Sequence, residues 1–346
     1  MPKMVLCLVM AVMGLAFAAG TPPPVWGDAF YQGKTINFIV GNAAGGGYDT
    51  YTRLVARHIR KHIAGNPTTI VQNMAGAGGL IAANHMYNKV KPDGLTVGVW
   101  NGALVLRQAL GDRKVRMDAA KVGWIGAPTV GMPTCAVMGF TGLKTLQDVL
   151  NAKQPIKMGS TRAGATTDDM PKILNKALGT RFDVISGYKG TSRIRLALQK
   201  REVDGVCFGW ESMRVTARAM LDASGDDKLI PIITHGKPQD PEVVNLPQIT
   251  EVVQGENLEI VNTWLQQYNF QRPLSLPPGT PQERIELLRR AFKAALEDPE
   301  LLAEAEKSGL TITHVPGEKI DTYVSQILSI SPQTKESLAF LMRRKK

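Results

Sequence analysis

The chain has 346 residues, of which 44% are hydrophobic and 21% are charged, and its formal net charge is +11. This length allows two domains with cores of their own, and the composition excludes a disordered chain. The lysines and arginines are scattered without aromatic residues between them, so we expect no nucleic-acid partner and assign the charge to solubility and the attraction of anions.

The first segment, residues 1–18, has the features of an export signal. A lysine precedes the apolar run 4–17, and small residues lead up to Ala18, where a signal peptidase would cut. The pattern predicts a cleaved signal peptide followed by a spacer over residues 19–33. No later run reaches transmembrane length, so we expect an exported, periplasmic protein.

A glycine-rich corner follows the first expected strand. Residues 35–40 are β-branched and apolar, as in a buried strand, and apolar residues at helical spacing follow over 50–63. Between them stand three consecutive glycines, which let the backbone approach a ligand closely. A helix start leaves amide N–H groups unpaired, so this corner can bind an anion without lysine or arginine. Taken alone, it is equally well explained as a simple turn.

A second glycine corner has the same form. It follows the strand expected over 68–72, spans residues 76–79 and opens a helix over 80–89. Adjacent parallel strands would direct both helix starts at one point, which favours a carboxylate or phosphate site. Neither corner completes a Walker or dinucleotide-binding motif. A third strand is expected over 95–100. Our candidate ligand-binding residues from the two corners and from the end of this third strand are Ala43, Ala44, Gly45, Gly46, Gly47, Tyr48, Asp49, Ala77, Gly78 and Asn101.

Two of these expectations have alternatives. Asp49 could meet a ligand or merely cap the helix. Arg162, in a hydroxyl-rich loop at a later helix start, could pair with a distal carboxylate, but we expect an ordinary exposed loop arginine.

Strand and helix patterns alternate along the rest of the chain. After the third strand and its helix, strands are expected over 122–126, 134–138, 156–158, 182–185, 203–210, 229–234 and 264–270. Repeated βαβ units predict an α/β protein with a parallel-rich, doubly wound sheet in each of two lobes and a ligand cleft between them. We expect lobe 1 over 34–128, lobe 2 over 129–234, and the completion of lobe 1 with C-terminal helices over 235–346.

Two helix starts are signalled in the C-terminal part. Thr280 and Glu283 have the spacing of a capping box, with a proline at the first helical position. Asp298 precedes another proline and repeats the signal, and Gly309 marks the end of that helix. We expect both helices to be structural.

Nothing in the sequence demands catalysis. His58 and His62 have the i, i+4 spacing of zinc ligands, but no third ligand follows, and we expect solvent-facing histidines. Cys135 and Cys207 lie in apolar strand-like runs, so we expect two buried free thiols, although an oxidising compartment would permit a disulfide. No nucleophile motif is present. We predict no enzyme, no cofactor and no metal.

Several motifs resemble the extracytoplasmic solute receptors of tripartite tricarboxylate transporters, the Bug family. They occur in order and nearly cover the mature chain, at 40–49, 72–79, 91–94, 187–190, 203–205, 276–281 and 298–299. The resemblance implies a periplasmic binding protein with a type II-like Venus-flytrap fold, working as a monomer. It also implies an anionic ligand, usually a carboxylate, that is delivered to membrane permease subunits.

The same resemblance suggests how the ligand is held. Main-chain amides of the two glycine loops would bind one carboxylate, and the second lobe would contribute Ser160, Thr161, Thr166, Tyr188, Trp210 and Glu211. The family's usual proline and aromatic residue are missing at 41–43, and Glu211 could repel a second carboxylate or bind a cationic or hydroxyl group. The ligand's identity therefore stays open. A sensor for a two-component system and, with less support, a secreted hydrolase or lyase are the alternatives.

Overall fold

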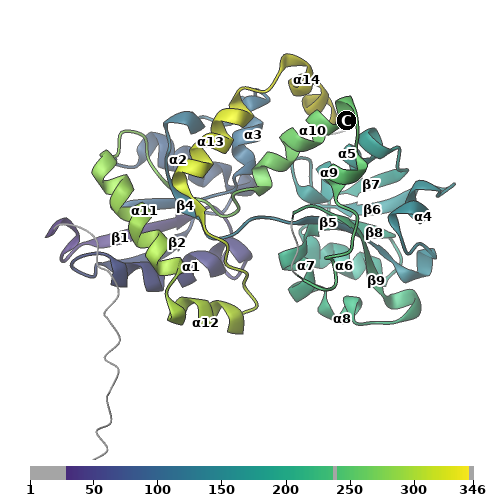
Figure 1. Cartoon of the computed structure of the whole chain (residues 1–346), viewed down its shortest axis with the longest axis horizontal. Coiled ribbons are helices and arrows are strands. Elements are labelled where there is room, and N and C mark those ends of the chain that lie inside the picture. Colours follow the sequence, from purple (N-terminus) through teal and green to yellow (C-terminus); the bar gives the residue numbers. More distant parts are fainter. Residues whose placement is uncertain (1–28, 237–239, 343–346) are drawn as a thin grey trace, which may run out of the picture.

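The computed structural model describes residues 29–236 and 240–342. Two β-sheets, each flanked by helices, form two lobes that lie side by side (Figure 1). We call the lobe with the six-stranded sheet lobe 1 and the lobe with the five-stranded sheet lobe 2. The predicted signal peptide and most of the spacer lie outside the described residues.

Lobe 1 is built on a sheet with the strand order β11-β4-β10-β3-β1-β2. Its strands are β1 (Thr35–Val40), β2 (Thr68–Asn73), β3 (Thr96–Val99), β4 (Gly123–Ala127), β10 (Leu274–Leu276) and β11 (Val315–Pro316). β1 pairs in parallel with β2 and β3, with Val40 opposite both Asn73 and Val99. These three strands therefore end at the same edge of the sheet, which is where the glycine corners follow.

The helices of lobe 1 cover its sheet because each has an apolar face. They are α1 (Gly47–Ile59), α2 (Leu80–Lys89), α3 (Ala103–Ala109), α11 (Gln282–Leu296), α12 (Pro299–Lys307) and α13 (Gly317–Leu328). α1 packs against α11, and its Leu54 and Ile59 share one buried cluster with Phe292. This packing fixes the direction in which the start of α1 points.

Lobe 2 has the strand order β7-β6-β8-β5-β9. Its strands are β5 (Pro133–Met138), β6 (Ile156–Ser160), β7 (Phe182–Ser186), β8 (Gly205–Gly209) and β9 (Leu229–Thr234), and its helices are α4 (Leu146–Leu150), α5 (Thr166–Leu178), α6 (Thr191–Gln199), α7 (Trp210–Thr216) and α8 (Arg218–Leu221). β6 pairs in parallel with β7 and β8, whereas β5 is antiparallel to β8 and β9. The predicted two-lobed α/β fold is confirmed, but the expectation of parallel-rich sheets is wrong. Two of the five strand pairs in lobe 1 and two of the four in lobe 2 are parallel, because β10 and β11 pair antiparallel with their neighbours in lobe 1 and β5 does so in lobe 2.

The C-terminal part contacts both lobes. Two helices follow β9, the last strand of lobe 2: α9 (Ile249–Val252) and α10 (Glu256–Leu265). The described chain ends with α14 (Pro332–Leu341). α10 and α14 pack on each other and on α5 of lobe 2, while α13 packs on α3 of lobe 1 (Figure 1). One buried cluster accordingly extends from Trp124 in lobe 1 to Met170 in lobe 2.

The strand predicted over 264–270 is wrong. Trp264 lies near the end of α10, and Tyr268 ends a 3₁₀ helix, η7 (Gln266–Tyr268). Their ring centroids are 5.0 Å apart, because residues four apart lie on the same face of a helix. A short apolar run of this kind does not distinguish a strand from the end of a buried helix.

The predicted capping box at the start of α11 is also wrong. Pro281 is the N-cap residue and makes no side-chain cap, and the hydroxyl of Thr280 instead donates to the carbonyl of Pro277 at 2.8 Å. The signal at α12 is confirmed, since the Asp298 carboxylate accepts the Glu300 amide at 2.9 Å.

The cysteines form a disulfide, so our expectation of free thiols is wrong. Cys135 of β5 and Cys207 of β8 are direct partners in an antiparallel pair, and both are fully buried. The cause is register: strand pairing places the two side chains next to each other, which the sequence separation of 72 residues does not reveal.

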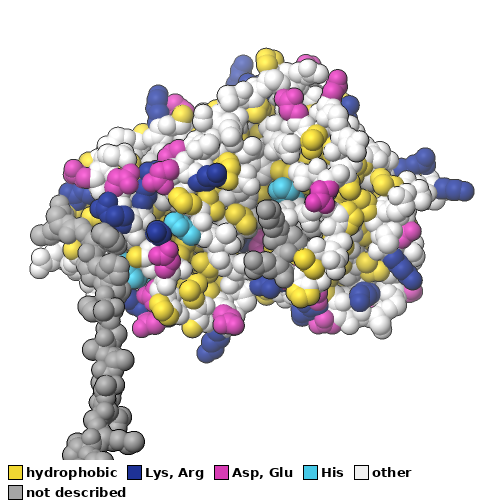
Figure 2. All heavy atoms as spheres, in the orientation of Figure 1, with side chains coloured by type: hydrophobic (Ala, Val, Ile, Leu, Met, Phe, Trp, Pro, Cys, Tyr) yellow, Lys and Arg dark blue, Asp and Glu magenta, His cyan; other side chains and the backbone are white. Residues whose placement is uncertain are grey.

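Charges of both signs are mixed on the surface. On the face shown in Figure 2, lysine and arginine side chains alternate with aspartate and glutamate. Among residues 29–236 and 240–342, no helix combines the length and the apolar character that a membrane span requires.

Candidate carboxylate-binding site

The first glycine loop joins β1 to α1 and is open to solvent. Residues 43–47 are exposed, and Gly46 is the N-cap of the helix. The first bond within the helix runs from the Thr50 amide to the Gly46 carbonyl at 2.9 Å, so the amides of residues 47–49 have no acceptor inside it. Exposed amides and the positive end of the helix dipole together attract an anion.

Asp49 holds this loop in shape. Its side chain is 5% exposed and accepts hydrogen bonds from the Gly45 amide at 2.9 Å and from Nε of Arg53 at 3.0 Å. The hydrogen bond from Arg53 is the largest cause that lowers the pKa of Asp49 from 3.8 to about 2. Asp49 therefore neither caps the amides of its own helix nor offers an unpaired carboxylate to a ligand.

Asn73, which the sequence did not single out, joins the two glycine loops. Its side-chain amide donates to the Asp49 carboxylate at 2.9 Å and to the Asn42 carbonyl at 2.9 Å. The backbones also meet, because a Cβ on Gly41 would lie 2.9 Å from the Cα of Gly79. The two corners are thus neighbours at the carboxyl edge of the lobe 1 sheet.

The second glycine loop has an unusual backbone. Ala77 and Gly78 both have positive φ, of 48° and 69°, and for alanine this conformation is unfavourable. Asn101 follows β3 beside this loop: a Cβ on Gly79 would lie 3.3 Å from its amide nitrogen. The Asn101 side chain accepts the Ala103 amide at 3.0 Å, so it closes the turn before α3.

Arg162 reaches the second glycine loop from lobe 2. Its guanidinium lies against Gly78 so closely that a Cβ on Gly78 would collide with Nη2. Partial desolvation of the guanidinium lowers the pKa of Arg162, and the nearby Arg107 lowers it further. Arg162 is exposed, as we expected, yet it also forms a contact between the lobes.

The hydroxyls of the lobe 2 loop differ in their availability. Ser160 is fully buried and donates to the carboxylate of Asp168 at 3.1 Å. The Thr161 hydroxyl lies 3.0 Å from that of Thr167, and the Thr166 hydroxyl lies 2.8 Å from that of Tyr268. The side chain of Ser160 is therefore committed within lobe 2, whereas Thr161 and Thr166 are half-buried.

The other predicted residues of lobe 2 are spread around it. Tyr188 is half-buried, and its amide donates to the Ser160 carbonyl at 3.2 Å. Trp210 is fully buried and donates its indole N–H to Asp240 at 2.9 Å, so its side chain belongs to the core and presents no surface to a ligand. The Glu211 carboxylate accepts the Met132 amide at 3.4 Å.

Arg272 faces Glu211 and the first glycine loop, and no sequence signal identified it. It follows Gln271, whose amide bonds to the Thr129 carbonyl at 2.9 Å where the chain passes between the lobes. The guanidinium is 4.4 Å from the ring centroid of Tyr51, and its Nη2 is 4.0 Å from the Glu211 carboxylate. The side chains from both lobes thus meet beside the start of α1.

Comparison with known proteins identifies the group to which the chain belongs. Residues 51–324 match the family model described as the tripartite tricarboxylate transporter family receptor. The chain belongs to this family. It is a family of periplasmic solute-binding receptors of tripartite tricarboxylate transporters rather than a family of enzymes.

Relatives and solved structures agree with this assignment. A UPF0065 protein of Agrobacterium vitis is 25% identical over 290 residues, which cover 78% of this receptor and 73% of the relative. A TctC solute-binding protein from Polaromonas is 18% identical with a TM-score of 0.67, covering 90% of this chain and 98% of that one. MatC of Rhodopseudomonas palustris, solved with bound malate, is 20% identical with a TM-score of 0.61, covering 88% and 99%. These structures share the receptor's fold.

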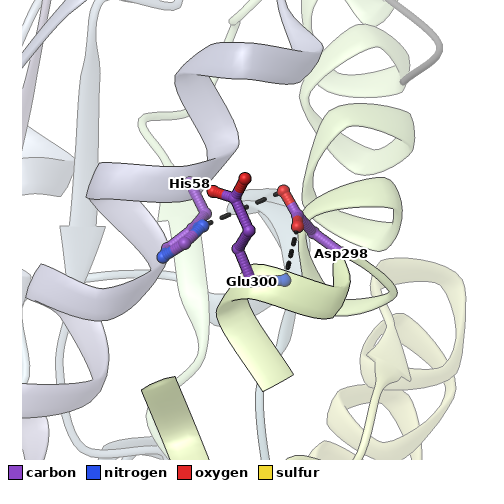
Figure 3. A group of neighbouring side chains, drawn as sticks. All are labelled: His58, Asp298 and Glu300. Carbon is purple, nitrogen blue, oxygen red and sulfur yellow. Dashed lines mark hydrogen bonds and ion pairs between the residues drawn. The ribbon is translucent and has the colours of Figure 1, made fainter. Parts of the chain in front are cut away.

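The two histidines of the receptor lie at the far end of α1 and are not solvent-facing, so that expectation is wrong. His58 and His62 are 6% and 1% exposed. α1, which carries His58, packs against α12, and the 3₁₀ helix η2 (Arg60–His62) packs against α11. Figure 3 shows His58 directed at Asp298, with Glu300 beside them. The Lys61 ammonium lies 3.2 Å from His58 and 3.7 Å from Asp298 and is bonded to Glu300. A lysine therefore stands where a metal would, and the group joins α1 to α12 through ion pairs.

Proposed function

We propose that this receptor captures a small organic anion between its lobes and delivers it to the membrane subunits of its transporter. A carboxylate is the class of anion that we propose to test. The single observation that carries the proposal is the exposed, unpaired start of α1, set beside the second glycine loop. Malate bound to MatC, which has the same fold, supports a carboxylate as the class of ligand.

We assign the ligand contacts to both lobes. In lobe 1 they are the main-chain amides of Ala43, Ala44, Gly46, Gly47 and Tyr48 and those of Ala77 and Gly78, which lie at one edge of the sheet. The Gly45 amide is not among them, because it donates to Asp49. In lobe 2 they are Thr161 and Thr166, with Arg162 next to Gly78 and Glu211 facing Arg272. Ligand that contacts both lobes binds the closed receptor better than the open one, and this difference in affinity drives closure.

We propose that export is followed by cleavage near Ala18 and that the receptor works as a monomer without a nucleic-acid partner. The delivery step rests on membership of the family.

The test is a thermal-shift screen of the mature receptor against malate, succinate, citrate, benzoate and a neutral sugar, with the ligand recovered and analysed by NMR. We expect a saturable rise in melting temperature with at least one carboxylate and recovery of that carboxylate unchanged. Stabilisation by the sugar alone, or conversion of the carboxylate, would overturn the proposal.

A further inference from the structure

The guanidinium of Arg272 is buried without satisfying its hydrogen bonds. The residue is 7% exposed, and its Nε and Nη1 have no hydrogen-bond acceptor among the described residues. Nη2 is 4.0 Å from the Glu211 carboxylate, which is an ion pair but too long for a hydrogen bond. A buried cation normally pairs more fully, because an unsatisfied charged donor is costly.

Two tyrosines and one glycine hold Arg272 in place. The guanidinium carbon lies 4.4 Å from the Tyr51 ring centroid and 5.6 Å from that of Tyr48. Tyr51 is fixed in turn, since its hydroxyl donates to the Thr311 carbonyl at 2.9 Å. A Cβ on Gly47 would lie 3.0 Å from Nη2, so the first residue of α1 leaves space for the close approach.

The backbone indicates that this placement is costly. Arg272 has a φ of 59°, and Ala77 in the second glycine loop has a φ of 48°. Of the four non-glycine residues with positive φ in the described ranges, these two lie at the candidate site. Such conformations persist where the surrounding structure enforces them and often accompany function.

We propose that Arg272 binds a carboxylate of the ligand directly, beside the start of α1, and that Glu211 is the internal anion with which the ligand competes. The inference rests on the proposed function and adds a charged side chain beside the main-chain amides of the first glycine loop. A carboxylate offers two acceptors in the geometry of a guanidinium, and Glu211 supplies only a distant one. Arg272 therefore selects for ionised carboxylates over their esters and amides.

Glu211 should have the opposite effect to Arg272 on ligand binding. It comes from the first turn of α7 in lobe 2, and its side chain is 11% exposed. Its charge partly neutralises Arg272 in the absence of ligand and repels an incoming carboxylate. Removing that charge should strengthen binding, whereas removing the charge of Arg272 should weaken it.

The experiment is titration calorimetry of the mature receptor and four variants at pH 7, with the carboxylate that most stabilises wild type in the screen above. We expect Arg272→Gln to weaken binding by about 100-fold or more and Arg272→Lys to weaken it less, since lysine keeps the charge but not the two-point geometry. We expect Glu211→Gln to bind about tenfold more tightly. Wild type should bind the carboxylate more tightly than the half-amide of the same ligand, and Arg272→Gln should no longer distinguish the two.

Arg284→Gln is the matched control. Arg284 is another poorly exposed arginine with a buried Nη1 that lacks an acceptor in the described structure, and it lies over the Phe30 ring before β1, at the other end of the strand from the glycine loop. The affinity of the Arg284→Gln variant for the carboxylate should equal that of wild type. An equal loss in Arg284→Gln, or unchanged affinity in Arg272→Gln, overturns the role of Arg272 while the proposed function stands.

The remaining outcomes are also decisive. If Arg272→Gln fails to fold, Glu211→Gln decides, and an unchanged affinity in that variant overturns the inference. If wild type binds none of the carboxylates at millimolar concentration, the proposed function fails, and the role of Arg272 fails with it.

Discussion

The side-chain amide of Asn73 donates to the carboxylate of Asp49 at 2.9 Å, across the two glycine loops of lobe 1. The same amide also donates to the Asn42 carbonyl, so one residue at the end of β2 fixes the loop that follows β1. The position of the exposed α1 amides relative to the second loop therefore depends on polar contacts to the buried Asp49 carboxylate rather than on the glycines alone.

Replacing Asp49 by Asn should lower the free energy of unfolding at neutral pH by about 2 kcal/mol. The pKa of Asp49 is lowered in the folded state from 3.8 to about 2, so its charge stabilises the fold above pH 4, and this contribution is lost as the pH falls toward 2. Urea unfolding of wild type and variant from pH 7 to pH 2 measures the difference. It should shrink across that window, and a difference independent of pH would contradict the role of Asp49.

Replacing Gly46 by Leu should abolish carboxylate binding without unfolding the receptor. Gly46 has a φ of −88°, which leucine tolerates, and a Cβ there would meet only the Ala43 carbonyl at 3.4 Å. The side chain would cover the start of α1. Calorimetry measures binding, and circular dichroism checks the fold. Ala120→Leu, at an exposed position before β4, is the control; retained affinity in the Gly46 variant would mean that the loop is only a turn.

Periodic segments were predictable because burial has a regular spacing. The strand at 35–40 and the helix at 80–89 match β1 and α2 residue for residue. The start of α12 was predictable for a similar local reason, since the Asp298 carboxylate accepts the amide of Glu300, two residues further along the chain. Each of these features is determined within a few residues of chain.

Features that depend on distant parts of the chain were not predictable. Cys135 meets Cys207 only through the register of β5 and β8. Arg272 belongs to no motif. It was noticed because tertiary structure brings it next to Tyr51 and Glu211 and because its φ is positive. The family resemblance assigned Trp210 to the site, but the structure turns its side chain into the core of lobe 2.

Removing the disulfide should destabilise lobe 2 without changing the affinity for carboxylates. The bond links neighbouring strands inside the sheet, and the double variant Cys135→Ala, Cys207→Ala should lose about 2 to 4 kcal/mol of stability. Thermal unfolding of the variant, and of wild type with and without a reductant, measures the loss. A variant as stable as oxidised wild type would show that the bond contributes nothing.

Zinc should not stabilise the wild-type receptor, because the Lys61 ammonium already contacts His58, Asp298 and Glu300. Replacing Lys61 by Ala removes this cation and leaves three candidate ligands together. We expect added Zn²⁺ to leave the melting temperature of wild type unchanged and to raise that of the variant. A rise in wild type that a chelator reverses would show a metal site in place of the ion pairs.

NMR titration of the glycine-labelled mature receptor tests the central claim most directly. With ¹⁵N-glycine and increasing malate or another stabilising carboxylate, we predict that the largest saturable shifts arise at the amides of Gly46, Gly47 and Gly78. Gly142 and Gly179, in lobe 2 away from these loops, should shift little. Saturable binding that leaves the three loop amides unperturbed, with the largest shifts elsewhere, would contradict the assignment of the carboxylate to the two glycine loops.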